Sequence, residues 1–136
     1  MTGEDATFRT VEGHGSARFA VRGSEFIGRV APAETVADAE GFIEAVRAEY
    51  ADATHNVPAY RVREDPLREW ASDEGEPAGS AGKPALNVLQ QEALENVVAV
   101  VTRYYGGTNL GVGGLARAYG RAVKAAVDDA GVVETV

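Results

Sequence analysis

The sequence predicts an α+β domain in which helices pack on one face of a mixed sheet. Segments rich in β-branched and aromatic residues alternate along the chain with segments whose apolar residues recur at helical spacing. With 136 residues, of which 45% are hydrophobic, the chain is long enough for one domain with a buried core. Burying the apolar faces of both kinds of segment requires helices packed against a sheet.

The first half of the chain is predicted to contain three strands, a helix and a fourth strand. Residues 8–11 and 18–22 alternate apolar and polar side chains, and residues 26–30 are typical of a third strand. Thr35 can cap a helix that runs to about residue 50, and residues 55–62 form the next strand. The apolar stripe of that helix consists of Val36, Ala39, Ile43, Val46 and Tyr50.

The second half begins with an irregular segment, residues 63–84, which indicates a long loop. A short helix is expected over residues 84–92, because proline suits a first helical turn. The apolar run 97–101 is typical of a buried central strand, which continues to residue 104. A helix is predicted over residues 115–130, and residues 132–136 begin a last strand.

Composition excludes several classes of protein. The chain has no cysteine, so it forms neither disulfides nor thiolate metal sites. It contains no apolar run of the roughly 18 residues that a membrane span needs, and its acidic start lacks a signal-peptide core. A cytoplasmic protein is expected. The net charge of −8 and the presence of only two lysines indicate adaptation to high salt.

Residues 96–127 contain no acidic side chain although the rest of the chain is acidic. The charges in this window are Arg103, Arg117, Arg121 and Lys124. On the predicted helix, the last three share one face, opposite an apolar one. This pattern indicates either a solvated basic face or a site for phosphate or carboxylate groups. Tyr105 is expected to share a strand face with Arg103, an arrangement suited to RNA.

A glycine-rich run precedes the basic helix, with glycines at Gly106, Gly107, Gly111, Gly113 and Gly114. Its second part matches the G-x-G-x-x-A dinucleotide fingerprint, but about six residues separate it from the strand, so this interpretation is not favoured. The run lacks the Gly-Lys-Ser/Thr of a P-loop. Positive φ angles and close chain approach explain the glycines better, with exposed N–H groups as a possible anion nest.

An acidic loop carries Asp73, Glu74 and Glu76, and His55 lies on a preceding strand. These groups could bind Mg²⁺ or act as general acid and base if they converge in one cleft. Alternatively, the acids are solvated or cap a helix. The histidines lack metal-ligand spacing, so no metal, cofactor or catalytic residue is assigned.

Several long motifs resemble those of the IMPACT/YigZ family. They lie at residues 24–28, 53–60, 72–84, 101–107 and 110–119, and the resemblance covers about residues 16–131. It implies that residues 1–136 are the N-terminal domain of that family, with the fold of the second domain of ribosomal protein S5. Bacterial-type members usually add a ferredoxin-like domain, which this chain does not contain. Val57 stands where cysteine is common, and Thr108-Asn109 replaces an apolar residue and a lysine.

The family resemblance implies a role in translation, because eukaryotic IMPACT is a translational regulator. The first hypothesis is therefore a non-enzymatic module that contacts RNA or a ribosome-associated factor through the glycine run and the basic helix. The second is a regulator that binds only protein. The third is a hydrolase or metal-dependent enzyme that uses His55 with the acidic loop. The oligomeric state is left open.

Overall fold

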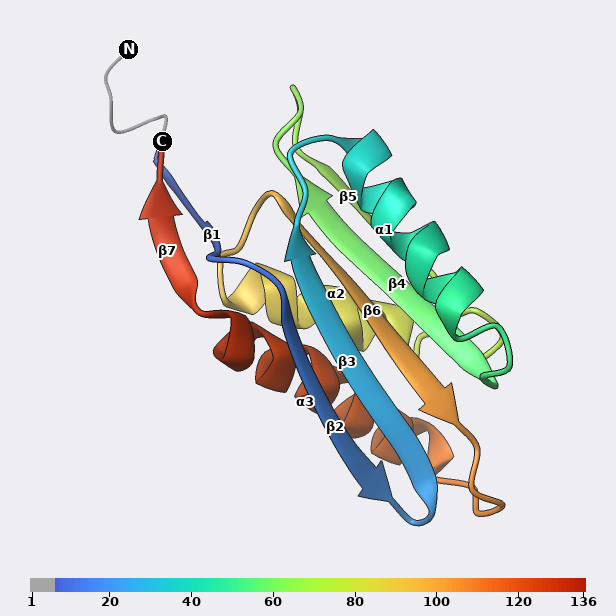
Figure 1. Cartoon of the computed structure of the whole chain (residues 1–136). Coiled ribbons are helices and arrows are strands. Elements are labelled where there is room, and N and C mark those ends of the chain that lie inside the picture. Colours follow the sequence, from blue (N-terminus) through green and yellow to red (C-terminus); the bar gives the residue numbers. More distant parts are fainter. Residues whose placement is uncertain (1–6) are drawn as a thin grey trace.

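The computed structural model describes residues 7–136, which form a five-stranded sheet, a separate two-stranded ribbon and three helices (Figure 1). The strand order of the sheet is β2-β3-β6-β4-β5. Its strands are β2 (Gly15–Val21), β3 (Ser24–Pro32), β6 (Val97–Tyr104), β4 (His55–Val62) and β5 (Arg68–Ala71). The ribbon pairs β1 (Phe8–Val11) with β7 (Val132–Thr135), and the helices are α1 (Val36–Glu49), α2 (Gly82–Gln91) and α3 (Gly111–Ala130).

The predicted α+β class is confirmed, but the sheet is antiparallel throughout and not mixed. The chain order β3-α1-β4 suggests a parallel pair. These two strands do run in the same direction, yet β6 lies between them and is antiparallel to both. Because β6 lies between β3 and β4, those two strands do not pair with each other, and each forms an antiparallel pair with β6.

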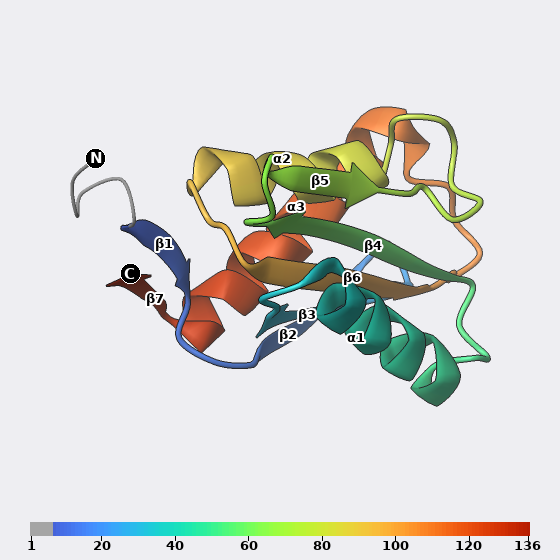
Figure 2. The same cartoon turned by 90° about the horizontal axis from the view of Figure 1, so that it is seen from above.

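The helices also cover both faces of the sheet, whereas one face was predicted. Helices α2 and α3 lie on one face, and α1 lies on the other (Figure 2). Strand β6 supplies both cores, because its side chains alternate between the two faces. Val101 packs toward α3, while Val98 and Val100 pack toward α1. This two-sided burial explains the continuous apolar run in the sequence.

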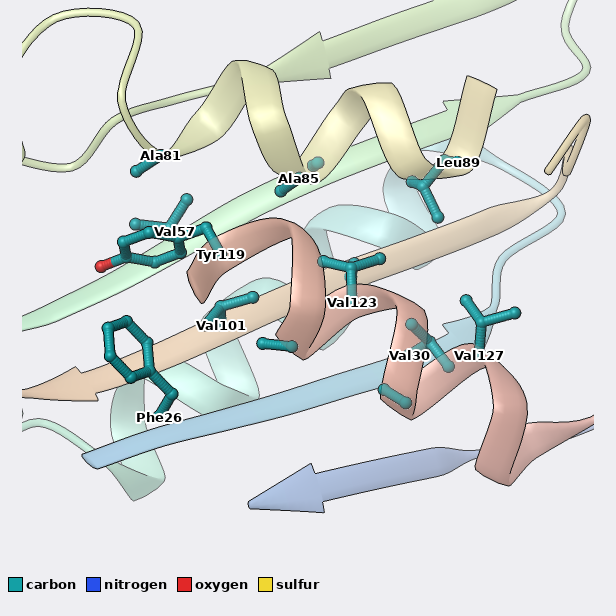
Figure 3. Close-up of a cluster of buried hydrophobic side chains, with 14 of the residues drawn as sticks. Phe26, Val30, Val57, Ala81, Ala85, Leu89, Val101, Tyr119, Val123 and Val127 are labelled. Atoms are coloured by element: carbon teal, nitrogen blue, oxygen red, sulfur yellow. The ribbon is translucent and has the colours of Figure 1, made fainter. Parts of the chain in front are cut away.

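The larger core lies between the sheet and the pair α2 and α3 (Figure 3). Phe26 and Tyr119 meet edge to face, with ring centroids 5.4 Å apart. Leu89 of α2 and Val123 of α3 are fully buried in the same cluster. The apolar face predicted for α3 is thus confirmed, and its opposite side is left free to face solvent.

Candidate functional site

Three arginines surround a surface pocket at the junction of the β2–β3 turn and α3. This arginine pocket has a volume of about 480 Å³ and is lined by Arg22, Arg117 and Arg121 with the apolar residues Val21, Leu110 and Ala118. Arg117 and Arg121 lie one turn apart on α3, so they share a side of the helix. Arg22 sits in the tight turn between β2 and β3 with φ of +50°. Sequence analysis missed Arg22 because it is distant along the chain.

The arginine pocket holds cations that no carboxylate neutralises. Among residues 7–136, four of the 13 basic side chains lack an acidic group within 4.0 Å, and three of these four are Arg22, Arg117 and Arg121. The guanidinium of Arg121 lies over the ring of Phe19, 3.8 Å from its centroid. Stacking orients the guanidinium but leaves its N–H donors available for an anion.

Lys124 lies on the same side of α3 but does not add free charge. Its ammonium group donates to Asp128 at 2.7 Å and lies 3.9 Å from Glu92. The hydrogen bond to Asp128 is the main cause of the raised pKa of Lys124. Desolvation acts in the opposite direction, and the nearby charges of Glu92 and Asp128 raise the pKa further. The cationic face predicted on α3 is therefore shorter than the sequence suggests, because its last member is paired.

Arg103 is buried, which corrects the expectation that it contributes to a basic surface. Its side chain is 6% exposed and donates to both carboxylate oxygens of Glu76, at 3.0 and 2.8 Å. Its second terminal nitrogen donates to Ser24 at 3.2 Å. Tyr119 also donates to Glu76, at 2.5 Å. The local strand pattern could not reveal this, because Glu76 comes from a distant loop.

Burial keeps Tyr119 in its neutral, donating form. Desolvation raises the pKa of Tyr119 far above its ordinary value, and the hydrogen bond to Glu76 raises it further. Glu76 thus accepts hydrogen bonds from a neutral phenol and a cation. The carboxylate is fixed by β6 and α3 together, beneath the surface of the sheet's end.

The acidic loop does not converge on a metal site. Of the three carboxylates in the loop, only that of Glu76 lies near His55, with His55 Nε2 3.5 Å from Glu76 Oε1. The Glu74 carboxylate accepts from Arg47 at 2.8 Å. The Asp73 carboxylate accepts from the backbone N–H groups of Ala81 and Gly82 at the start of α2 and from that of Gly79 in the preceding loop. Within residues 7–136, no group of three or more His, Cys, Asp or Glu side chains is placed to hold a metal ion. The capping alternative therefore describes Asp73.

Burial on its own raises the pKa of Asp73, but hydrogen bonds from the backbone N–H groups of Gly79, Gly82 and Ala81 lower it by more. The carboxylate is held ionised by these three donors at 2.8, 2.9 and 3.2 Å. Asp73 therefore organises the loop that delivers Glu76.

His55 is held with one ring nitrogen toward the loop. Its Nδ1 lies 2.7 Å from the carbonyl oxygen of Glu74, and a carbonyl only accepts hydrogen bonds. The Nδ1 atom therefore carries a proton, and in the neutral ring Nε2 is the acceptor. Nε2 is the nitrogen on the side of Glu76.

A second cavity of about 510 Å³ lies above this buried network. This Tyr105 pocket has His55, Glu76 and Arg103 among its polar lining, and Tyr105, Leu110, Val112 and Leu115 among its apolar lining. Tyr105 lies one residue beyond the end of β6 and not on the strand as expected. It is 48% exposed, and the Arg103 guanidinium lies 5.4 Å from its ring centroid. Leu110 lines both the Tyr105 pocket and the arginine pocket, so the two cavities are neighbours.

The glycine run divides into a loop and a helix start. A Cβ at Gly106 would lie 2.0 Å from the carbonyl carbon of Gly23, and Gly107 and Gly111 have positive φ. Close approach and positive φ therefore explain these three, as expected. Gly113 and Gly114 instead belong to α3, which starts at Gly111 and not at residue 115. Because Gly113 and Gly114 are helical, the loop beside the Tyr105 pocket is shorter than the sequence predicted.

The family model described as the Impact N-terminal domain matches residues 22–127. This chain belongs to the IMPACT family. The matched range includes every residue that lines the two pockets except Val21. The resemblance inferred from the sequence motifs is therefore confirmed.

The chain is similar to a curated IMPACT family member and to two solved structures. The chain is 41% identical over 128 residues to the IMPACT family member YvyE of Bacillus subtilis, covering 94% of this chain and 59% of YvyE. A crystal structure of a hypothetical protein has a TM-score of 0.88 and 36% identity, over 96% of this chain and 64% of that one. The translational regulator Yih1 shares the fold alone, with a TM-score of 0.52 and 23% identity over 88% of this chain and 48% of Yih1.

The chain spans less than two thirds of the length of these proteins. Within residues 7–136, no helix has the length and apolar character needed to cross a membrane.

Proposed function

We propose that this domain is a binding module that acts in translation or its regulation and contacts RNA through the arginine pocket. Membership of the IMPACT family and the description of Yih1 as a translational regulator support the association with translation. The contact with RNA rests on one observation: Arg22, Arg117 and Arg121 share a pocket and lack carboxylate partners among residues 7–136.

The protein's net charge makes this observation informative. A chain with a net charge of −8 can neutralise any exposed arginine with a nearby carboxylate, and most of its arginines are paired in that way. An unpaired group of three attracts an anion to one place against the overall repulsion. Guanidinium groups match phosphate oxygens with paired N–H donors, and phosphates recur along a nucleic-acid strand.

Co-sedimentation with ribosomes from the protein's own source tests this function, at native salt and with or without nuclease. The wild-type domain is expected to co-sediment, and nuclease treatment is expected to release it. The Arg117→Glu/Arg121→Glu variant should fail to co-sediment while keeping a wild-type far-UV circular dichroism spectrum, since both side chains are exposed. Arg18→Glu/Arg68→Glu is the matched control, because it makes the same change in charge at exposed arginines that already pair with Glu25 and Glu64.

Two results would contradict contact with RNA. Co-sedimentation that survives nuclease but is lost in the Arg117→Glu/Arg121→Glu variant would assign the arginine pocket to a protein partner. Equal loss in both double variants would show that net charge, and not the pocket, governs binding. An enzymatic function is not proposed. Of the three carboxylates in the acidic loop, only that of Glu76 lies near His55, and it is held by hydrogen bonds from Arg103 and Tyr119.

A further inference from the structure

We infer that the Tyr105 pocket receives one unpaired nucleobase of a single-stranded RNA, with preference for bases that carry an amino group. This inference deepens the proposed contact with RNA and rests on it for the phosphate position. The pocket volume of about 510 Å³ falls within the roughly 300–1,000 Å³ typical of small-molecule sites. The question is which chemical group of a nucleotide such a cavity accepts.

The walls of the Tyr105 pocket suit a flat group with apolar faces. Tyr105 is exposed at the rim, and Leu110, Val112 and Leu115 line the cavity from the loop and α3. A nucleobase has two π faces and polar edges, so it can stack on an aromatic ring and contact aliphatic side chains. Exposed Val112 and Tyr105 gain burial when such a ring enters, which favours occupancy.

The floor of the pocket excludes phosphate. Glu76 contributes a carboxylate, and the only cation in the described lining, Arg103, already donates to both of its oxygens. A phosphate entering here would meet a negative group whose counter-charge is in use. The three arginines without a carboxylate partner among residues 7–136 lie in the neighbouring arginine pocket, which the Tyr105 pocket meets at Leu110. A nucleotide can therefore place its phosphate on the arginines and its base in the Tyr105 pocket.

The hydrogen-bonding groups at the floor favour particular bases. With its proton on Nδ1, neutral His55 offers Nε2 as an acceptor. The neighbouring Oε1 atom of Glu76 accepts one hydrogen bond from Arg103 and has a second lone pair for a donor from the base. Two acceptors require a donor on the base. Adenine, cytosine and guanine carry exocyclic amino groups, whereas uracil presents carbonyl oxygens on both sides of its single N–H. The geometry therefore predicts discrimination against uracil.

Titration of the ¹⁵N-labelled domain with nucleosides tests the pocket without phosphate. Adenosine is expected to shift the amide resonances of Tyr105, Leu110 and Val112, whereas uridine at the same millimolar concentration shifts them little. Tyr105→Ala should abolish the adenosine response. Trp70→Ala is the matched control, because Trp70 is a similarly exposed aromatic, 42% against 48%, on β5 outside the pocket lining. Absence of adenosine-specific shifts in the wild-type domain would overturn the inference whatever the outcome with ribosomes.

Fluorescence anisotropy with labelled oligo(rA) and oligo(rU) of equal length tests whether the two pockets bind the same RNA strand. The wild-type domain is expected to bind oligo(rA) about tenfold more tightly, and Tyr105→Ala to remove about tenfold of that affinity. His55→Phe should equalise the two ligands, because it removes the acceptor and keeps an aromatic ring. Equal affinity of the wild type for both ligands, lost in Arg117→Glu/Arg121→Glu, would overturn the base pocket and leave the proposed function standing. Failure to bind any oligonucleotide, alongside adenosine-specific shifts, would instead overturn RNA contact at the arginines.

Discussion

Glu76 joins three parts of the chain that are far apart in sequence. Glu76 lies in the loop before α2, and its side chain is 3% exposed. Its carboxylate accepts hydrogen bonds from Arg103 of β6 and Tyr119 of α3. A buried ion pair of this kind contributes little net stability over an apolar core, yet removing one partner leaves the other charged, buried and unpaired. Glu76 is therefore expected to matter far more to stability than an exposed glutamate.

Replacing Glu76 by Gln is expected to lower the free energy of unfolding by about 3 kcal/mol, because Arg103 then remains buried without a counter-charge. The matched control is Glu74→Gln, in the same loop, whose carboxylate pairs with Arg47 near the surface and whose loss should cost at most about 1 kcal/mol. Urea denaturation at neutral pH measures both. Equal losses of unfolding free energy in the two variants would show that the buried Glu76 network contributes no more to stability than an exposed ion pair.

Asp73 is expected to make the stability of the fold depend on pH in the acidic range. Because its folded-state pKa is lowered by the N–H donors of Gly79, Gly82 and Ala81, its ionised form stabilises the fold above the ordinary pKa of 3.8. That stability is lost as the pH falls below 3.8 and through the folded-state pKa. Asp73→Asn should therefore lower the melting temperature at pH 6, with the difference from wild type shrinking toward pH 3. Glu40→Gln, at an exposed site on α1, should show no such convergence.

At the scale of elements, α3 lies unusually close to the sheet. A Cβ at Gly28 of β3 would lie 2.3 Å from the carbonyl oxygen of Ala122, and one at Gly15 of β2 would lie 2.2 Å from that of Ala126. Only glycine permits this approach of helix backbone to strand backbone. The contact fixes the position of α3, and with it the positions of Arg117, Arg121 and Tyr119.

Gly28→Ala is expected to destabilise the domain by about 2 kcal/mol or more, because backbone on the helix must move to admit the methyl group. Gly41→Ala is the control. Gly41 lies inside α1 with no atom within 4 Å of an added Cβ, so alanine should stabilise by about 0.5–1 kcal/mol through its helix propensity. Thermal unfolding of both variants decides the matter, and a neutral Gly28→Ala would mean that α3 can slide on the sheet.

Local patterns identified most of the elements but not their pairing. The apolar run of β6 and the two-sided character of α3 follow from periodicity, so both were predictable. Strand β5 escaped prediction because its four residues are mostly exposed and hold together through pairing with β4. The antiparallel sheet depends on β6 inserting between β3 and β4, which no local signal records.

The candidate site divides in the same way. Arg117 and Arg121 could be placed on one face from their four-residue spacing alone. Arg103 looked equivalent to them, but its partner Glu76 lies 27 residues away and reaches it only through the tertiary fold. Arg22 joins the arginine pocket from the β2–β3 turn for the same reason. The local sequence pattern thus predicts which side of an element a charged residue lies on, but it does not predict which distant residue pairs with that charge.

At the scale of the whole molecule, an acidic body carries a small cationic site. The net charge of −8 repels a polyanion at long range, while Arg22, Arg117 and Arg121 attract it at contact. Added salt screens the repulsion and also weakens the contact, because bound phosphates no longer gain as much from releasing counterions. The balance between these opposing effects is measurable.

Binding of single-stranded RNA should therefore depend on salt to a degree set by the arginine pocket. Each phosphate contact adds about −0.7 to the slope of the logarithm of affinity against the logarithm of salt concentration, so three arginines give about −2. Arg121→Ala is expected to make the slope shallower by about 0.7, whereas Arg68→Ala, which removes an arginine already paired with Glu64, should leave it unchanged. Anisotropy titrations across a salt series provide the slopes. Equal slopes for wild type and Arg121→Ala would contradict RNA contact at the arginine pocket. A cation that contacts a phosphate releases a counterion, so its loss has to change the slope.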